Sequence, residues 1–249
     1  MSESNYFKFT NAVVVAPLVG IILIWTVFWM ELKFQVNLNE YGVFPRTLKG
    51  LRGVLFSPFL HGSVEHLYNN TLPLAILTAS LFYFYKKIAL KVLLYGIIIS
   101  GILTWLIGRP SFHIGASGII YVLASFTFFK GIFSKYYRLV ALSLIVVFIY
   151  GGLLWYIFPI KDEISWEGHL GGFMTGLMLA LFMRAETPTA KKFDWEYDNY
   201  NEEADEFLKH FDEEGNFIET KPEEFDNKID PVKITYQFRK KDSTEPPGN

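Results

Sequence analysis

The stretch GHLGGFMTG, residues 168–176, opens a hydrophobic segment that continues to Met183. Its glycines at positions 168, 172 and 176 recur every fourth residue, a spacing that repeats along one side of a helix. Small residues at this spacing allow two membrane helices to bring their backbones into close contact. His169 shares a helix face with Gly172 and Gly176. The stretch therefore predicts a tightly packed membrane helix that carries an imidazole on its contact face.

Five further hydrophobic segments precede this one. A helix needs about 20 apolar residues to cross the roughly 30 Å hydrocarbon core of a bilayer. Six segments of about this size occur, over residues 12–30, 67–85, 88–107, 115–133, 139–158 and 169–183. Charged residues lie mainly between them, because a charge at mid-bilayer costs about 2.5–3.5 kcal/mol. We therefore predict an all-α polytopic membrane protein, with a six-transmembrane-helix domain over residues 1–184 and a polar, acidic tail over residues 185–249.

The composition agrees with this division. Hydrophobic residues make up 51% of the 249-residue chain, and phenylalanine alone occurs 24 times. The net charge is +6 over residues 1–183 and −8 over residues 184–249. The chain has no cysteine, which excludes disulfides, cysteine-bound zinc, iron–sulfur clusters and a thiol nucleophile. The first segment is too long for the core of a signal peptide, and we expect it to be a retained transmembrane helix.

The tail has only weak patterns of its own. Residues 232–238 alternate as a short strand would, and residues 212–216 resemble a calcium-binding loop without its ligand spacing. Acidic, polar sequence of this kind is typical of a solvated tail.

The short loops predict the orientation. Lysine and arginine flank the turns after the second and fourth segments and follow the sixth, whereas the opposite short loops hold only Arg109 and Lys161. Because positive charge accumulates on the cytoplasmic side, both termini are expected to be cytoplasmic. The compact six-helix form suggests an integral protein of the bacterial inner membrane.

Polar residues with catalytic chemistry stand at the starts of the second, fourth and sixth segments. These residues are His61, His66, Asn69 and Asn70, then Ser117, and then His169. In an antiparallel bundle, helices of even number all begin at the same membrane face. Three groups far apart in the sequence are therefore expected at one depth, near the outer face. Taken singly, each has an ordinary explanation as a helix cap or a packing residue.

The residue types suggest a serine nucleophile. A serine hydroxyl becomes reactive when an adjacent imidazole accepts its proton, which points to Ser117 with His169 as its base. His66 and Asn70 are four residues apart and can donate to an oxyanion, as can the amide of Ser117 at a helix start. No carboxylate opens an even-numbered segment, so a dyad is favoured over a triad. Tyr121, one turn after Ser117, is a candidate support for the imidazole.

Together these stretches resemble the rhomboid intramembrane proteases. The matching residues lie in HGSVEHLYNN (61–70), in GASG (115–118) with Tyr121, and in GHLGGFMTG (168–176). One departure is Leu51-Arg52 in the first loop, where the family often has Trp-Arg.

The resemblance implies a six-helix bundle with a wet cavity open to the outer face. Ser117 would be the nucleophile, His169 the base, and His66, Asn70 and the Ser117 amide the oxyanion site. Further residues that match the motifs would support or shape the site, namely Gly115, Tyr121, His61, Gly118, Gly172 and Gly176. The substrates would be transmembrane proteins within the lipid bilayer, and residues 138–166 would form a lateral gate. No metal, cofactor or nucleic acid is expected.

Three alternatives are open. A catalytically inactive rhomboid-like protein would bind membrane clients, although such relatives typically lack the serine or the histidine. A transporter would use the polar helix starts to line a path, and it predicts intramembrane charges or paired broken helices. A metalloprotease would use His61, His66 and His169, but the chain has no His-Glu-x-x-His pattern and no evident carboxylate ligand.

Overall fold

The computed structural model describes residues 7–161, 163–186, 193–202, 205, 207–212 and 214–218. The chain divides into two compact units, residues 1–190 and residues 191–249, and each is considered by itself.

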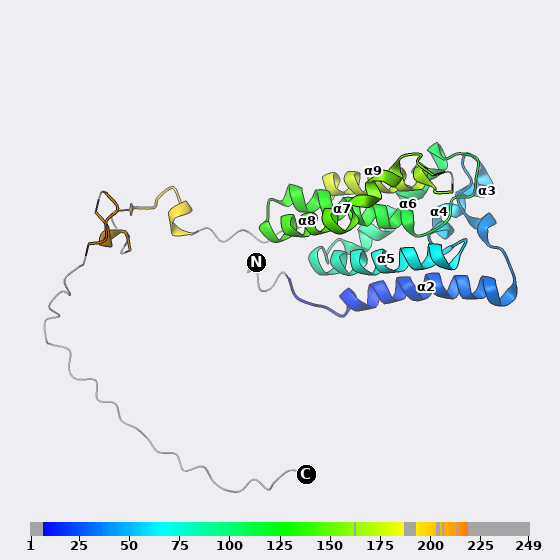
Figure 1. Ribbon diagram of the computed structural model, residues 1–249, viewed down its shortest axis with the longest axis horizontal. Coiled ribbons are helices and arrows are strands. Elements are labelled where there is room, and N and C mark those ends of the chain that lie inside the picture. The colour runs from blue at the N-terminus through cyan, green and yellow to red at the C-terminus, as the bar shows by residue number, and fades with distance from the viewer. Residues whose placement is uncertain are drawn as a thin grey trace, which may run out of the picture. The chain divides into compact units, whose positions relative to one another are not determined.

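The described residues of the first unit form six long helices, and Figure 1 shows their arrangement. They are α2 (Ala12–Phe34), α5 (Val64–Phe84), α6 (Ala89–Ile107), α7 (Ser117–Ser134), α8 (Tyr137–Tyr150) and α9 (Trp166–Phe182). Each predicted segment therefore has a helical counterpart. The described residues hold no named strand and only two isolated β-bridges, so the all-α prediction is confirmed for this part of the chain.

Two boundaries differ from prediction in ways that affect the site. The fifth helix was expected to run to residue 158, but α8 ends at Tyr150 and the chain continues as a 3-10 helix, η3 (Gly151–Ile157). Two successive glycines begin η3, and glycine disfavours a regular α-helix by about 1 kcal/mol. The sixth helix was expected to begin at His169. It begins at Trp166, where the Ser165 side chain caps it by accepting from the Gly168 amide at 3.3 Å.

Only some of these helices meet the length and composition of a membrane span. Among the described residues, α2, α6 and α7 do so, and α8 is apolar but shorter. In α5, the polar residues of its first two turns, among them Asn69 and Asn70, lower the hydropathy. Helix α9 has 17 residues. Large apolar side chains are nonetheless exposed on the outside of the bundle, including Trp29, Phe148 and Phe182, as expected of a surface that faces lipid.

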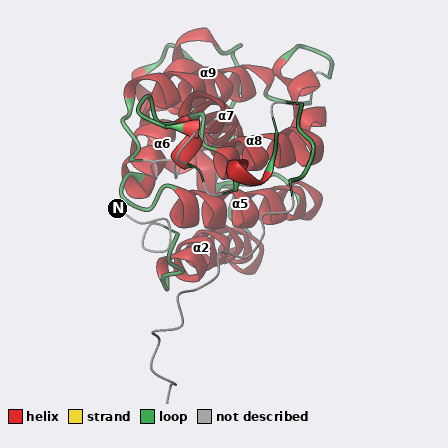
Figure 2. Ribbon diagram, turned by 90° about the vertical axis from the view of Figure 1, so that its left-hand side faces the viewer, coloured by secondary structure: helices red, strands yellow, loops and turns green. Residues whose placement is uncertain are grey.

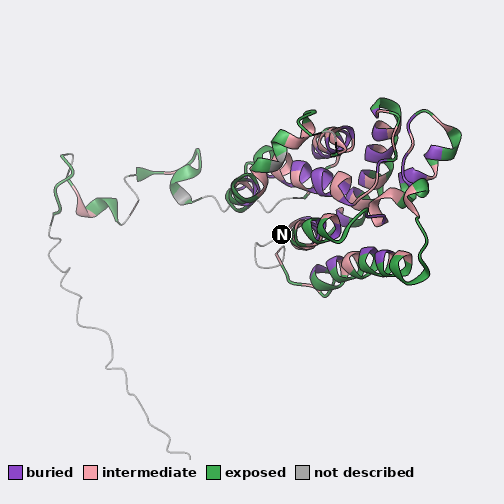
Figure 3. Cartoon of the chain, turned by 45° about the vertical axis from the view of Figure 1, so that its right-hand side comes forward, coloured by how far each residue is buried: buried purple, intermediate pink, exposed green. Residues whose placement is uncertain are grey.

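Helix α7 is the centre of the bundle. It packs against α9, α8, α5 and α6, while α2 packs against α5 at the edge. Figure 2 shows the helices in cross-section, and Figure 3 shows that the buried residues gather on the helix faces turned inward. The buried core includes Leu123 and Phe126 of α7 with Leu67 and Leu77 of α5. Ser117, the first residue of α7, is therefore anchored by the most buried helix of the unit.

The chain between α2 and α5 folds into short helical turns. These are η1 (Asn39–Tyr41), α3 (Leu48–Leu51), α4 (Gly53–Phe56) and η2 (Ser57–Phe59). A side chain at Gly53 would lie 2.2 Å from the carbonyl oxygen of Gly42, so the turns stack backbone on backbone. The Val54 side chain packs against Gly101 of α6. This segment therefore supports the bundle beside the predicted site.

The described residues of the second unit form short turns. Two 3-10 helices, η4 (Asp194–Glu196) and η6 (Leu208–His210), precede a β-bridge between Phe211 and Phe217. The Asp212 carboxylate accepts from the amides of Glu214 and Asn216, so residues 212–216 form a tight turn held by that side chain. The strand predicted over residues 232–238 lies outside the described residues.

Candidate active site

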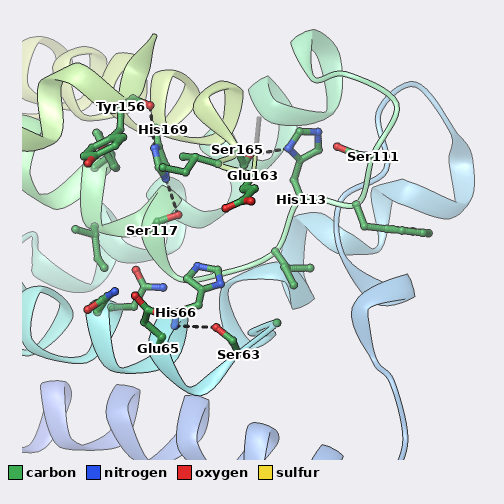
Figure 4. Close-up of a pocket in the computed structure, with 18 of the residues that line it drawn as sticks. Ser63, Glu65, His66, Ser111, His113, Ser117, Tyr156, Glu163, Ser165 and His169 are labelled. Carbon is green, nitrogen blue, oxygen red and sulfur yellow. Dashed lines mark hydrogen bonds between the residues drawn. The ribbon is translucent and has the colours of Figure 1, made fainter. Parts of the chain in front are cut away.

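Ser117 and His169 are in hydrogen-bond contact. The serine Oγ lies 2.9 Å from Nε2 of the histidine, and Figure 4 shows the two side chains pointing toward each other. Ser117 is the first residue of α7, and His169 lies in the first turn of α9. A separation of 52 residues in the sequence is thus closed by two helices that begin at the same end of the bundle.

Glycines allow this close approach. Helix axes are usually about 8–10 Å apart, which is wide for a direct bond between two short side chains. A Cβ atom at Gly172 would lie 2.2 Å from the carbonyl oxygen of Gly118, and one at Gly176 would lie 2.4 Å from that of Val122. The backbones of α7 and α9 therefore touch. A Cβ at Gly118 itself would meet only an ordinary contact at 3.6 Å.

A main-chain carbonyl sets the tautomer of the histidine. Nδ1 of His169 lies 3.0 Å from the carbonyl oxygen of Tyr156, in η3. A carbonyl can only accept, so Nδ1 carries the proton. In the neutral ring, Nε2 then has a lone pair that can accept a hydrogen bond. The Ser117 hydroxyl then donates to Nε2. This is the arrangement that general-base catalysis by the imidazole requires.

An aromatic ring supports the imidazole from one side. The ring of Tyr121 is stacked on that of His169, with centroids 4.3 Å apart and planes 14° from parallel. Tyr121 is buried and lies one turn after Ser117 on α7. The face of an aromatic ring attracts positive charge, so this stack would also stabilise an imidazolium.

Hydrogen-bond donors lie on the opposite wall of the site. Gly115 has a φ of +110°, and a Cβ there would lie 2.7 Å from the ring of His66. Asn70 is buried, and its Nδ2 has no hydrogen-bond partner among the described residues. The side chains of His66 and Asn70 both come from α5 and line the same cavity as Ser117. An unpaired buried donor is costly unless something binds to it, so this wall is suited to an oxyanion.

His61 holds the backbone just before Ser117. Its Nε2 accepts from the amide of Ala116 at 3.4 Å, and its ring meets that of His66 edge-on at 5.1 Å. Burial, together with the smaller effect of the nearby His66, lowers the pKa of His61 to about 4. His61 is therefore neutral at pH 7 and acts as an acceptor within the framework.

These groups surround a cavity of about 730 Å³. Its wall includes His66, Asn70, Ser117, Tyr121, Tyr156 and His169. The first two come from α5, the next two from α7, and the last two from η3 and α9. All the predicted polar site residues thus come together at one end of the bundle. His61 is there too, although it does not line the cavity and instead contacts the ring of His66.

Other polar residues near the site were not predicted. His113 is buried and lies 2.6 Å from the hydroxyl of Ser165. Glu167 is only 1% exposed and accepts from the backbone amide of Arg109 at 3.1 Å, so it does not orient His169. The sequence offered one indication of His113 and Glu167, which is that both are polar and lie within a few residues of Ser117 and His169. The carbonyl of Tyr156 had no such signal.

Comparisons with known proteins agree with the motifs. The sequence family described as Rhomboid domain matches residues 49–186, a range that contains every residue of the candidate site. Uncharacterized proteins of Mycobacterium bovis and Mycobacterium tuberculosis are each 34% identical to the chain over 169 residues, which is 62% of this chain and 68% of theirs. An uncharacterized protein of Mycobacterium leprae is 34% identical over 149 residues, which is 54% of this chain and 57% of that protein.

Proposed function

Because the chain belongs to the rhomboid family, we propose that it is an intramembrane serine endopeptidase that cleaves transmembrane protein substrates with Ser117 and His169. The family consists of integral membrane proteins, and its members are generally serine proteases that act within the bilayer. The mycobacterial relatives are uncharacterized and indicate no activity, so the proposal for this chain depends on its own site.

One observation carries the proposal. The Ser117 hydroxyl is 2.9 Å from Nε2 of His169, while the Tyr156 carbonyl accepts from Nδ1 of the same ring. An inactive client-binding relative would have no need for a serine, an imidazole in the basic tautomer and an unpaired amide donor in one cavity. Each of these features is required for acyl transfer.

The first half of the reaction forms an acyl-enzyme. Ser117 Oγ attacks the scissile carbonyl carbon while Nε2 of His169 takes the hydroxyl proton. The carbonyl oxygen becomes an oxyanion, to which His66, Asn70 and the Ser117 amide donate. The amide of Ser117 begins α7 and has no acceptor within the helix, so its dipole points at the developing charge. The tetrahedral intermediate collapses, the C–N bond breaks, and the imidazolium returns the proton to the leaving amine.

The second half releases the product. A water molecule gives its proton to Nε2 of His169 and attacks the acyl carbon, and the same donors hold the second oxyanion. The C–Oγ bond then breaks, and Ser117 recovers its proton. The cavity of about 730 Å³ contains polar groups on several sides, which suits it to hold the water that this step consumes.

We further propose that α2, α5, α6, α7, α8 and α9 all cross the membrane. The exposed apolar side chains of the bundle and the apolar segments of the sequence support this. The basic loops then put both termini and the acidic tail in the cytoplasm. The mycobacterial relatives support a bacterial cell membrane.

A fluorophosphonate probe tests the proposal. The purified protein in detergent or bilayer should be labelled at Ser117 and should cleave a model transmembrane substrate. Ser117→Ala and His169→Ala should each remove both activities while the thermal midpoint stays close to that of the wild type. Ser134→Ala, which changes a hydroxyl at the far end of α7, is the matched control and should leave both activities unchanged. Zinc chelation should have no effect.

A folded wild-type protein that several probes fail to label, and that cleaves no transmembrane substrate, would contradict the proposal and favour the inactive client-binding protein.

A further inference from the structure

An ion pair between the partly exposed Arg109 and the buried Glu167 joins the segment before Ser117 to the start of α9. The backbone amide of Arg109 donates to Oε1 of Glu167 at 3.1 Å, and its Nε lies 3.8 Å from the same oxygen. Its Nη2 donates to the carbonyl of Ile164 at 2.8 Å. Arg109 precedes Ser117 by eight residues, and Glu167 precedes His169 by two. The pair therefore connects the two segments that carry the candidate catalytic residues.

A second connection runs parallel to the first. His113 Nε2 lies 3.1 Å from the carbonyl of Arg109, which can only accept, so Nε2 carries the proton. Burial lowers the pKa of His113, so the ring is neutral at pH 7. Nδ1 is then an acceptor, and the Ser165 hydroxyl donates to it at 2.6 Å. Figure 4 shows His113 and Ser165 facing each other beside the cavity.

The other side of this segment is held by backbone hydrogen bonds. The His113 amide and carbonyl pair with those of Val43, at 2.9 and 3.0 Å. The Gly115 amide donates to the carbonyl of Ser57 at 2.9 Å. These bonds fix the segment to the first loop, but they do not reach α9. The contacts of Arg109 with Glu167 and of His113 with Ser165 instead join the segment to the start of α9.

We propose that Arg109, His113, Ser165 and Glu167 form a clamp whose function is to position Ser117 against Nε2 of His169. The inference rests on the proposed function, since it concerns the geometry of that dyad. The glycine contacts of α7 and α9 set how closely the helices approach along their length. The clamp sets how their ends are aligned. These four side chains are positioning residues and do not take part in the proton transfers.

The charges of the clamp make a specific prediction. Glu167 is 1% exposed, and its Oε2 has no hydrogen-bond partner among the described residues. Removal of the Arg109 side chain alone would leave the buried Glu167 carboxylate without the guanidinium beside it, which is less favourable than two neutral side chains at these positions. Glu167→Gln keeps an oxygen that can accept from the Arg109 amide. The double variant Arg109→Gln/Glu167→Gln should therefore be closer to wild type than Arg109→Gln alone.

The experiment measures kcat and KM on a model transmembrane substrate, together with the fluorophosphonate labelling rate and the thermal midpoint. Arg109→Gln and His113→Phe should each lower kcat by about tenfold or more, because small misplacement of reacting groups costs up to about 10²-fold. KM and the folded fraction should change little. The double variant should recover most of the kcat lost in Arg109→Gln. Lys49→Gln/Glu40→Gln removes an exposed ion pair of the first loop and is the control that should leave kcat unchanged.

Hydrogen exchange of residues 108–117 supplies a readout that needs no catalysis. Exchange should rise in Arg109→Gln and fall back in the double variant. The inference is overturned if kcat stays at the wild-type value in the single variants, if the loss of kcat merely follows the loss of folded protein, or if the double variant is no better than Arg109→Gln. An unlabelled, inactive wild type would contradict the proposed function instead. In that case unchanged exchange in Arg109→Gln would overturn the clamp on its own.

Discussion

The main-chain carbonyl oxygen of Tyr156 lies 3.0 Å from Nδ1 of His169. In a serine–histidine–aspartate triad a carboxylate orients the imidazole. Here a backbone acceptor in η3 occupies that position, so the buried Glu167 is available to pair with Arg109. The orientation of the base therefore depends on where η3 runs. The path of η3 is set in turn by the end of α8 at Tyr150.

This contact predicts the tautomer of His169 in the protein without substrate. The imidazole ¹⁵N spectrum of histidine-labelled protein at neutral pH should show His169 with a protonated Nδ1 and an unprotonated Nε2. The His169→Asn variant identifies the signal by its absence. A resting ring with its proton on Nε2 would contradict the predicted role of the Tyr156 carbonyl, since the serine hydroxyl would then have no acceptor.

Asn70→Ala should lower kcat. Its Nδ2 is buried without a partner among the described residues, and loss of one oxyanion donor typically costs about 10²–10³ in kcat. KM should change little, because the donor is needed mainly in the transition state. Thr71→Ala is the neighbouring control, since the Thr71 hydroxyl bonds within α5 and to Trp25. Equal kcat values for the two variants would remove Asn70 from the oxyanion site.

Tyr121 should act through its ring. Tyr121→Phe retains the surface that stacks on His169 at 4.3 Å and should keep kcat within about threefold of the wild type. Tyr121→Leu removes the aromatic face, whose contact is worth about 1 kcal/mol, and should lower kcat by about fivefold or more. Steady-state kinetics on a model substrate make the comparison. If the leucine variant matched the phenylalanine variant, the stack would have no part in catalysis.

Gly172→Ala should disrupt both packing and activity. The added methyl group would lie 2.2 Å from the Gly118 carbonyl oxygen, so α7 and α9 must separate. Overpacking of this kind costs about 1–3 kcal/mol, and the longer Ser117–His169 distance should reduce probe labelling. Gly20→Ala in α2 is the control, because a Cβ there would meet only the Leu74 side chain, at an ordinary contact distance of 3.8 Å. The thermal midpoint should fall in the first variant and hardly change in the second. The same midpoint in both would contradict the close helix contact.

Acid should destabilise the fold through His61. Its pKa is about 4 in the folded protein, against an ordinary value of 6.5, so the unfolded chain binds a proton first as the pH falls. The neutral ring therefore contributes fully to the free energy of unfolding above about pH 6.5. This contribution, about 3 kcal/mol, is lost as the pH falls from about 6.5 through about 4. The ring of His66, 5.1 Å away, opposes a charge at His61. His61→Gln should flatten the loss of the thermal midpoint between about pH 7 and 4.5. An equally steep loss in that variant would exclude His61 as the cause.

Much of the site could be predicted because membrane helices obey simple geometry. Hydrophobic segments of bilayer length identify the helices. In an antiparallel bundle the second, fourth and sixth of them, which are α5, α7 and α9, begin at one face. His66, Ser117 and His169 could therefore be assigned to a common level from the order of the residues. The glycine repeat at 168, 172 and 176 likewise indicated a close contact, although it did not reveal that Gly118 and Val122 are the partners.

Other features depended on how the chain turns between helices. The premature end of α8 follows from Gly151-Gly152, yet a glycine pair can equally be tolerated within a membrane helix. The pairing of Arg109 with Glu167 spans 58 residues. Taken singly, each charge is typical of a helix end at a membrane surface.

Hydrophobic length and helix direction, both readable from the residues, were enough to establish the helical class, the segments of the bundle, and the level at which a serine and an imidazole meet. The three-dimensional path of the chain was needed for the 2.9 Å contact of Ser117 with His169, the proton position set by the Tyr156 carbonyl, and the clamp at the helix ends. The distance between two side chains depends on how their helices pack. A contact made by the main chain has no signature in the sequence, because every residue has a backbone carbonyl and every residue but proline a backbone amide. Such contacts become visible only when the course of the backbone is known.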